Sequence, residues 1–227
     1  MELIMMKIVS VNIGKIQTYP WRNGTQSALH KRPIQVPIFI NQLGLEGDEQ
    51  ADRNNHGGTD KAVFILPSGH YQRFKIQQPF GFLGENLTLE GLDESQICLG
   101  DRFQMGELLL EVTQPRSPCW KLGQHACIQD NWTLSSFLHT YSKEGYVGFY
   151  CRVLSSGTAQ AGQPITWLPY QGSNKTLTIQ ALFLAKQHYQ TVQDQQQLQI
   201  AIKHPALSSA WKNSLKSQLT RPLNPLK

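Results

Sequence analysis

The chain has 227 residues, of which 40% are hydrophobic and 16% charged, and it carries a formal net charge of +5. These values predict an ordered globular protein with a buried core, in one domain or in one domain with a small appendage. A mean hydropathy of −0.36 and the lack of a long apolar run exclude a membrane bundle. The basic residues are dispersed and form no Lys/Arg run, so the surplus predicts no nucleic-acid partner.

Two further features concern the compartment and the cysteines. Residues 3–13 are apolar but are interrupted by Lys7 and Asn12 and lack a small-residue cleavage site, so they predict a first strand and not a signal peptide. We therefore expect a cytoplasmic protein, in which thiols are reduced. No Cys-x-x-Cys pair occurs, which argues against a structural zinc site or an iron-sulfur cluster. The four cysteines are Cys98, Cys119, Cys127 and Cys151.

In the first third of the chain, alternating apolar positions predict strands at residues 7–13 and 34–43. The polar, glycine-rich segment at 44–58 fits neither regular period and predicts a long functional loop. A strand at 62–66 and a short helix within 67–74 are expected after it.

The end of that loop reads HGGTDK and is a candidate anion site. Gly57 and Gly58 would let backbone N–H groups approach an anion closely, and Arg53, His56 and Lys61 can supply positive charge. A tight turn before a strand explains the same glycines equally well. The acidic residues of the loop match no calcium-binding template, so we expect no hard-cation site.

The middle of the chain predicts a β-barrel or sandwich, because short strands follow one another with glycine turns between them. These strands are expected at 87–89, 96–99, 101–105 and 107–113, and later at 148–154 and 165–168, with a helix within 131–143. The barrel domain would therefore span residues 1–170. Three helices, at 177–187, 193–203 and 207–219, predict a small helical appendage at residues 175–227.

The segment QPRSPCWKL is the strongest candidate site. Pro115 and Pro118 end the preceding strand and allow a helix to begin only at Pro118. Ser117 would then be the N-cap and Cys119 would lie in the first turn, where backbone N–H groups, the helix dipole and Arg116 favour the thiolate. Cys119 is thus predicted to be reactive or to bind a metal. A buried cysteine that acts as a small hydrophobe is the alternative.

Four runs of sequence together resemble the MOSC domain, a family named after the C-terminal domain of molybdenum cofactor sulfurases. The runs are GLEGDEQADRNNHGGTDKAV, GENLTLEGL, LGDRFQMGELLLEVTQPRSPCWKL and GFYCRVLSSGTAQAG, which cover most of residues 7–168. The HGGTDKA and PRSPC motifs are the most specific parts. Gln163 departs from the family pattern, which has Asp there, but it falls in a predicted turn outside the candidate site.

The resemblance implies an α+β fold that is mainly β, namely a MOSC-type β-barrel with a small C-terminal three-helix domain. It also implies that the barrel binds the molybdenum cofactor, a Mo-molybdopterin, with Cys119 as metal ligand and catalytic residue. A soft thiolate suits a metal that is held by dithiolene sulfurs. The cofactor phosphate would face the glycine turn, Lys61 and Arg116, and the pterin would face Glu85 and Asn86. The full set of expected cofactor-binding residues is Arg53, His56, Gly57, Gly58, Lys61, Glu85, Asn86, Arg116 and Ser117.

The activity that the resemblance implies is reduction of N-hydroxylated compounds, such as hydroxylaminopurines and related hydroxylamines, to amines. His56 and Asp101 are candidate proton donors. The chain has neither a nucleotide-binding fingerprint nor a cluster motif, so we expect electrons from a separate reductase or a ferredoxin-like protein. A homodimer is possible, and neither a membrane nor a nucleic acid is expected as a partner.

Two other functions stay open. The protein could carry the molybdenum cofactor or its sulfur without turnover of its own. Alternatively, Cys119 could be a nucleophile in acyl or sulfur transfer, with His125 or His56 as the base. The nucleophile hypothesis predicts activity in metal-free protein, whereas both molybdenum hypotheses predict none.

Overall fold

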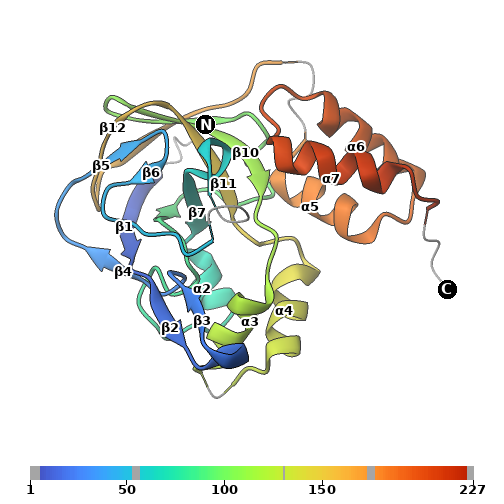
Figure 1. Ribbon diagram of the computed structural model, residues 1–227. Coiled ribbons are helices and arrows are strands. Elements are labelled where there is room, and N and C mark those ends of the chain that lie inside the picture. The colour runs from blue at the N-terminus through green and yellow to red at the C-terminus, as the bar shows by residue number, and fades with distance from the viewer. Residues whose placement is uncertain (1–5, 53–56, 130, 173–176, 224–227) are drawn as a thin grey trace.

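The computed structural model describes residues 6–52, 57–129, 131–172 and 177–223, and a β-barrel forms its centre (Figure 1). An eight-stranded sheet has the order β13-β9-β10-β11-β7-β8-β1-β4, and β13 also pairs with β1. β4 lies outside this closure, so seven strands make the barrel. They are β1 (Met6–Gly14), β7 (Val63–Pro67), β8 (Leu87–Glu90), β9 (Arg102–Met105), β10 (Leu108–Pro115), β11 (Phe149–Ser155) and β13 (Pro164–Leu168). The barrel is mixed because β7 and β8 are parallel, and the expected barrel is confirmed.

Smaller elements decorate the barrel. β12 (Gly157–Ala159), β5 (Ile38–Asn41) and β6 (Gly44–Leu45) form a three-stranded sheet, and β4 (Lys31–Ile34) extends β1. A hairpin of β2 (Gln17–Tyr19) and β3 (Thr25–Ser27) encloses the short helix η1 (Trp21–Asn23). The sequence pattern did not predict this hairpin.

Two predicted strands are wrong. The strand expected at 34–43 is split into β4 and β5 around Pro37, which has no N–H to donate to a ladder. The strand expected at 96–99 makes only one isolated bridge, from Cys98 to Thr178. Its backbone turns because the Cys98 N–H donates to the Asp101 carboxylate at 2.9 Å.

Strand β7 shows how the barrel and the helices divide the core. All five of its residues are buried. Because side chains alternate along a strand, Val63 and Ile65 join the cluster inside the barrel, whereas Phe64 and Leu66 join a second cluster outside it. A strand that is covered on both faces reads as a continuous apolar run.

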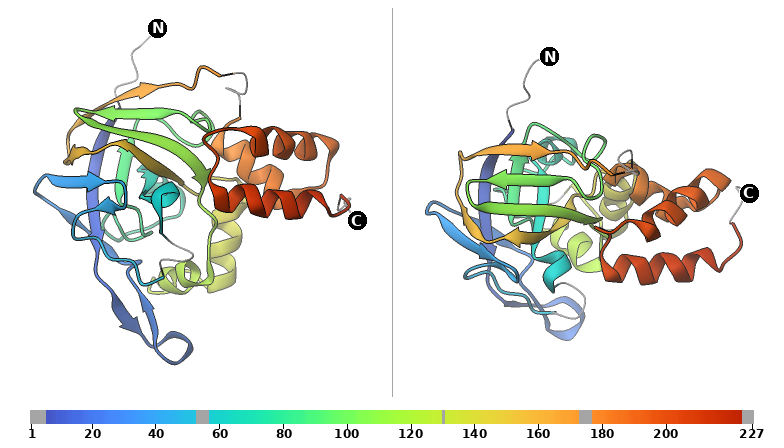
Figure 2. Two further views of the ribbon diagram at one scale, coloured as in Figure 1. Left: turned by 45° about the horizontal axis from the view of Figure 1, so that its top comes forward. Right: turned by 90° about the horizontal axis from the view of Figure 1, so that it is seen from above.

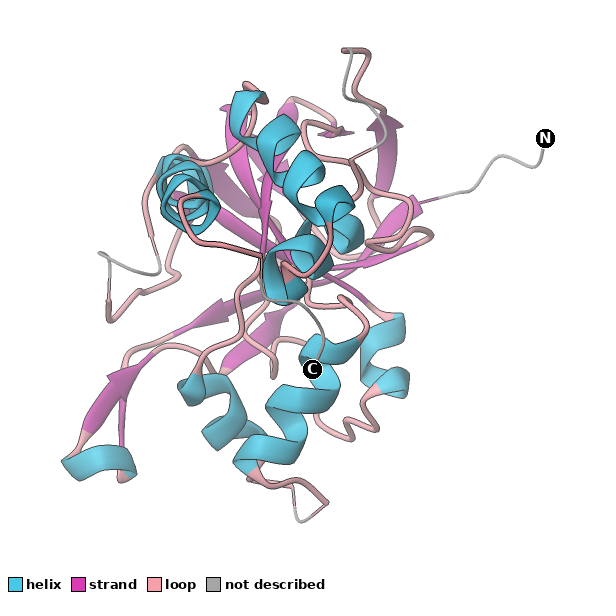
Figure 3. Ribbon diagram, turned by 90° about the vertical axis from the view of Figure 1, so that its right-hand side faces the viewer, coloured by secondary structure: helices cyan, strands magenta, loops and turns pink. Residues whose placement is uncertain are grey.

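The helices cover that outer cluster. α2 (Gly69–Arg73), α3 (Trp120–Ala126) and α4 (Leu134–Lys143) contribute to it together with the C-terminal helices α5 (Ile179–His188), α6 (Val192–Lys203) and α7 (Ser209–Leu219). The C-terminal helices lie beside the barrel (Figure 2), and they stand in front of the strands when their side faces the viewer (Figure 3). None of the helices in the described part of the chain has the length and apolar character of a membrane span.

The three C-terminal helices are confirmed, and each begins at a side-chain cap. Thr178, Thr191 and Ser208 each accept a hydrogen bond from a backbone N–H of the first turn. Such a cap satisfies one of the N–H groups that a helix end leaves unpaired.

Candidate functional site

A pocket beside Cys119 brings together part of the predicted site. The pocket is open to solvent, and the space between its walls, solvent included, is about 680 Å³. The charged and polar residues of its wall include Lys31, Asp48, Lys61, Asn86, Arg116 and Cys119, together with Glu49, Asp52, Lys121 and Tyr150.

Cys119 reaches this pocket from the turn between β10 and α3. The prediction that the helix begins at Pro118 with Ser117 as its cap is wrong by two residues. Cys119 is itself the N-cap, with φ −122° and ψ 164°, and helix α3 begins at Trp120. Its carbonyl accepts the first helical N–H, from Leu122, at 3.0 Å. Ser117 is exposed and faces a different cleft.

Arg116 supplies an uncompensated positive charge to the pocket wall. It is only 4% exposed, and its Nη1 has no hydrogen-bond partner within the described residues. Its guanidinium carbon lies 5.1 Å from the ring centroid of Phe64 and 5.8 Å from that of Tyr141. Burial acts to lower the pKa of Arg116, but the neighbouring Tyr141 and Cys119 outweigh it and the pKa is raised. Arg116 is hydrogen-bonded to Tyr141 and Tyr150, but it forms no ion pair with a carboxylate of the described residues. A buried cation with an unsatisfied nitrogen is costly, so its place in this wall points to an anionic ligand.

Asn86 lies in the same wall and is held by a compensated ion pair. Lys31 Nζ is 2.5 Å and 2.6 Å from the two carboxylate oxygens of Asp48, and both side chains are nearly buried. Asn86 Nδ2 donates to Asp48 Oδ2 at 2.9 Å, and the Phe64 N–H donates to Asn86 Oδ1 at 3.1 Å. The Lys31–Asp48 pair therefore adds shape and rigidity to the wall and no net charge. Sequence reasoning missed Lys31, because only the pairing of β4 with β1 brings it near Asp48.

The HGG turn delivers Lys61 to the pocket. Gly58 has φ +90°, a conformation that favours glycine, and it caps the short helix η2 (Thr59–Lys61). Burial lowers the pKa of Lys61, while Asp60 and Asp52 act to raise it. Gly57 and Gly58 precede η2 and are not among the residues that line the pocket. Arg53 and His56, which were also predicted to bind, lie outside the described residues.

Glu85 has a structural position behind the wall. Its side chain is fully buried and accepts hydrogen bonds from Tyr71 Oη and the Gly81 N–H, both at 2.7 Å, and from Thr88 Oγ1 at 3.1 Å. Burial raises the pKa of Glu85. The side chain closes the turn that leads to Asn86, and it is not among the residues that line the pocket.

Two other candidates do not reach Cys119. Asp101 accepts hydrogen bonds from Trp167 Nε1 at 2.8 Å and from the Tyr170 N–H at 2.7 Å, so it supports the barrel rather than donating a proton to the pocket. His125 is fully buried, and neither ring nitrogen has a hydrogen-bond partner in the described part of the chain. Burial, and then His30, lower its pKa to about 3. Among the described residues no hydrogen bond joins His125 to Cys119, so the structure gives no support to His125 as the base of a cysteine nucleophile.

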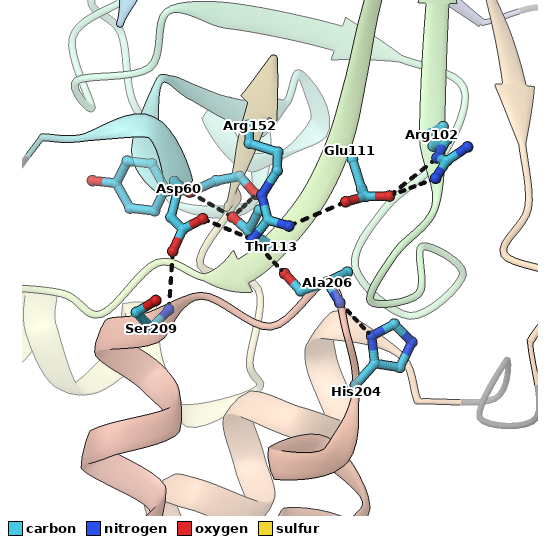
Figure 4. Close-up of polar contacts among 9 residues, drawn as sticks. Asp60, Arg102, Glu111, Thr113, Arg152, His204, Ala206 and Ser209 are labelled. Carbon is cyan, nitrogen blue, oxygen red and sulfur yellow. Dashed lines mark hydrogen bonds and ion pairs between the residues drawn. The ribbon is translucent and has the colours of Figure 1, made fainter. Parts of the chain in front are cut away.

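The segment that carries Lys61 is tied to the C-terminal helices (Figure 4). The Asp60 carboxylate accepts a hydrogen bond from Arg152 Nη2 at 2.7 Å and one from the Ser209 N–H at 2.9 Å. Arg152 Nη2 also donates to the Ala206 carbonyl at 2.9 Å, and Arg152 Nη1 donates to Glu111 at 3.3 Å. Arg152 is therefore part of an ion-pair network with Asp60 and Glu111.

The segment that carries Arg116 and Cys119 is tied to the same helices. Ser208 Oγ donates to Gln114 Oε1 at 2.6 Å, and the Ser208 N–H donates to the Thr113 carbonyl at 3.2 Å. The start of α7 therefore holds both segments that build the pocket wall.

Cys119 is not part of a protein metal cluster. Within the described residues, no group of three or more His, Cys, Asp and Glu side chains is placed to hold a metal ion. A metal bound at Cys119 would therefore have to bring its other ligands with it, as a metal in an organic cofactor does.

The fold and the pocket define a class: a mixed β-barrel protein with a cysteine thiol and a buried arginine on the wall of one pocket. The chain belongs to the MOSC domain family, whose model matches residues 52–166. It is similar to Protein YiiM of Escherichia coli (strain K12), with 38% identity over 164 residues that cover 69% of this chain and 70% of that protein.

Two further relatives extend the comparison. The crystal structure of YiiM from Geobacillus stearothermophilus matches with a TM-score of 0.74 and 31% identity, over 94% of this chain and 99% of that one. The three C-terminal helices thus belong to a YiiM-like fold. A protein named "Reductase" from Gibberella moniliformis is 31% identical over 173 residues, which are 72% of this chain and 30% of that protein. The MOSC family is commonly associated with the molybdenum cofactor.

Proposed function

We propose that the chain binds the molybdenum cofactor through Cys119 and reduces N-hydroxylated compounds to amines. The observation that carries the proposal is that the Cys119 thiol lies on one pocket wall with the buried guanidinium of Arg116, whose Nη1 has no partner among the described residues. The relative named "Reductase" supports an oxidoreductase.

The residues of the pocket fit this cofactor. A soft thiolate is a suitable ligand for a metal that is already bound by dithiolene sulfurs. The phosphate of the cofactor would give Arg116 the anion that the protein lacks, and Lys61 lines the same pocket. When bound, the metal centre supplies the two-electron chemistry that removes oxygen from nitrogen.

The protein's own residues would bind the cofactor, orient the substrate and supply a proton to it. The rigid Lys31–Asp48–Asn86 group fixes one wall of the pocket. Lys61 Nζ is suited to deliver a proton, because burial lowers its pKa toward the working pH. In the overall reaction, a hydroxylamine, two electrons and two protons give an amine and water.

Two cysteine variants test the proposal. Cys119→Ser is compared with Cys127→Ser, a matched control on the far end of α3 whose thiol donates to the Gly123 carbonyl at 3.2 Å and does not line the pocket. Each protein is produced in a host that makes the cofactor, and its molybdenum and pterin contents are measured. Cys119→Ser should retain less of both, because it loses the metal ligand but keeps the contacts to the phosphate, and Cys127→Ser should keep both.

A turnover assay then separates the reductase from a carrier. Loaded wild-type protein is supplied with a hydroxylaminopurine and chemically reduced methyl viologen, and amine formation is measured. Loaded protein that forms no amine would favour the carrier function. Full activity and metal content in Cys119→Ser would remove Cys119 from the mechanism.

A further inference from the structure

The positive charge of the protein is concentrated in its C-terminal part. Residues 171–227 hold seven Lys and Arg residues and a single acidic residue, Asp194, whereas residues 1–170 hold 14 Lys and Arg against 15 Asp and Glu. The C-terminal unit therefore has a net charge of +6 and the barrel unit has −1. The basic residues form no run in the sequence, but they are not evenly dispersed either.

A groove between α5 and α7 collects part of this charge. It has an empty volume of about 1300 Å³, and Lys186, His188 and Arg221 line it without any acidic residue. Neither Lys186 nor Arg221 forms an ion pair in the described part of the chain. The carboxylate of Asp194 is used elsewhere, since it accepts the N–H groups of Gln190 and Thr191 at 3.0 and 2.9 Å. Asp194 also interacts electrostatically with His188, and Lys186 Nζ lies 4.9 Å from the Trp211 ring centroid. The groove thus presents two cations, Lys186 and Arg221, that no carboxylate of the described residues neutralises.

The groove continues into a cleft behind the cysteine turn. This cleft, of about 600 Å³, is lined by Ser117 and Pro118 on one side and by Trp211 on the other. Lys186 and Gln187 line both the cleft and the groove, which are therefore contiguous. Pro118 is bonded to Cys119, so a partner in the groove would approach the cysteine through a cleft that shares no lining residue with the cofactor pocket.

We infer that the groove between α5 and α7 is the docking surface of an acidic redox protein that delivers electrons to the site at Cys119. The inference rests on the proposed function, which requires two electrons from outside the chain. Opposite charge steers such partners together, and electron-transfer complexes are small and transient. A second copy of the chain is a poor occupant, because it would bring one +6 surface against another.

The electron balance of the proposal is simple. Two molecules of a one-electron donor are each oxidised by one electron, and with two protons from solvent they convert the hydroxylamine to the amine and water. Oxidised donor then leaves the groove, which a charge-based, salt-sensitive contact permits.

The first test is a binding titration that needs no turnover. The probe is a plant-type [2Fe–2S] ferredoxin, which is small and acidic, titrated against the cofactor-loaded protein at low and at moderate salt. Removal of both groove cations by Lys186→Gln with Arg221→Gln should weaken binding about tenfold at low salt and reduce its salt dependence. The matched control is Lys75→Gln with Lys143→Gln, which removes two exposed positive charges of the barrel unit that form no ion pair in the described part of the chain. It should change binding by less than about twofold.

The second test uses turnover with two donors. The groove variant should show a raised KM for reduced ferredoxin and an unchanged rate with reduced methyl viologen, which needs no docking. Equal weakening by the groove and control variants, or none by either, would overturn the docking surface. Binding of a single-stranded RNA probe that depends on Lys186 and Arg221, without ferredoxin binding, would also overturn it. If the wild-type protein forms no amine with reduced methyl viologen, the proposed reductase activity is refuted instead. The binding titration still tests the docking surface in that case.

Discussion

Arg116→Met tests whether the buried guanidinium is present for a ligand or for the fold. Methionine has a similar length and can fill the same space without a charge. The main-chain bond from the Arg116 N–H to the Gly148 carbonyl, at 2.9 Å, is kept. If Arg116 serves an anion that the protein lacks, the cofactor-free variant should be more stable than the wild type and should bind the cofactor more weakly.

The expected size follows from the contacts of the side chain. A buried donor without a hydrogen-bond partner, here Arg116 Nη1, costs about 1–3 kcal/mol. The contacts of the guanidinium with Phe64, Tyr141 and Tyr150 return about 1 kcal/mol. The net gain in the free energy of unfolding is about 1 kcal/mol, or about 2–4 °C in Tm for a chain of this size. Loss of charged hydrogen bonds to a phosphate would cost about 1.5–3 kcal/mol of binding, which is roughly 10- to 150-fold in affinity.

The assay is urea unfolding of cofactor-free protein, together with pterin content after production in a cofactor-making host. Arg152→Met is the control, because that guanidinium is paired with Asp60 and Glu111 and its loss leaves two partly buried carboxylates. It should destabilise the protein by about 2 kcal/mol. If Arg116→Met destabilises the protein as Arg152→Met does, Arg116 belongs to the fold and the argument for an anion is refuted.

Two further predictions concern the contact between α7 and Asp60 and the buried His125. Ser209→Pro removes the N–H that donates to Asp60 at the first position of α7, where proline is tolerated. The preceding Ser208, with φ −59° and ψ 149°, suits a following proline, so helix content should stay unchanged. The free energy of unfolding should fall by about 1 kcal/mol, and hydrogen exchange at residues 57–61 should become faster. Unchanged exchange there would mean that α7 does not hold the Lys61 segment. His125 has a folded pKa of about 3, below its unfolded value of 6.5, so the unfolded chain binds more protons between these values and stability should fall as the pH drops from 6.5 toward 3, by about 2 kcal/mol at pH 5. Urea unfolding at pH 7.5 and pH 5 should show this loss in the wild type and a smaller loss in His125→Phe, and equal losses would contradict it.

Local sequence patterns were sufficient to predict strands and helices that depend mainly on neighbouring residues. The continuous apolar run of β7 and the side-chain caps of α5, α6 and α7 are local features, and the structure has those elements. The β2–β3 hairpin has no such run. It packs its aromatic residues on α3, where the Trp21 and Trp120 rings lie 6.4 Å apart, and that contact joins residues about a hundred positions apart.

The candidate site was predictable in part for the same reason. Cys119, Arg116, Lys61 and Asn86 lie in recognisable motifs, and all four line one pocket. The roles of Glu85 and Lys31 depend on which segments of the chain lie beside them in the folded barrel. A glutamate in a glycine-rich turn does not reveal in advance that Tyr71 and the Gly81 N–H will occupy its carboxylate.

The central claim is that the Cys119 sulfur is a ligand of molybdenum. X-ray absorption at the molybdenum edge measures the sulfur atoms bound to the metal, in wild-type protein and in Cys119→Ser reconstituted with the same cofactor. The account predicts one sulfur fewer around molybdenum in the variant, with Cys127→Ser identical to the wild type. The same sulfur count in all three proteins would contradict it.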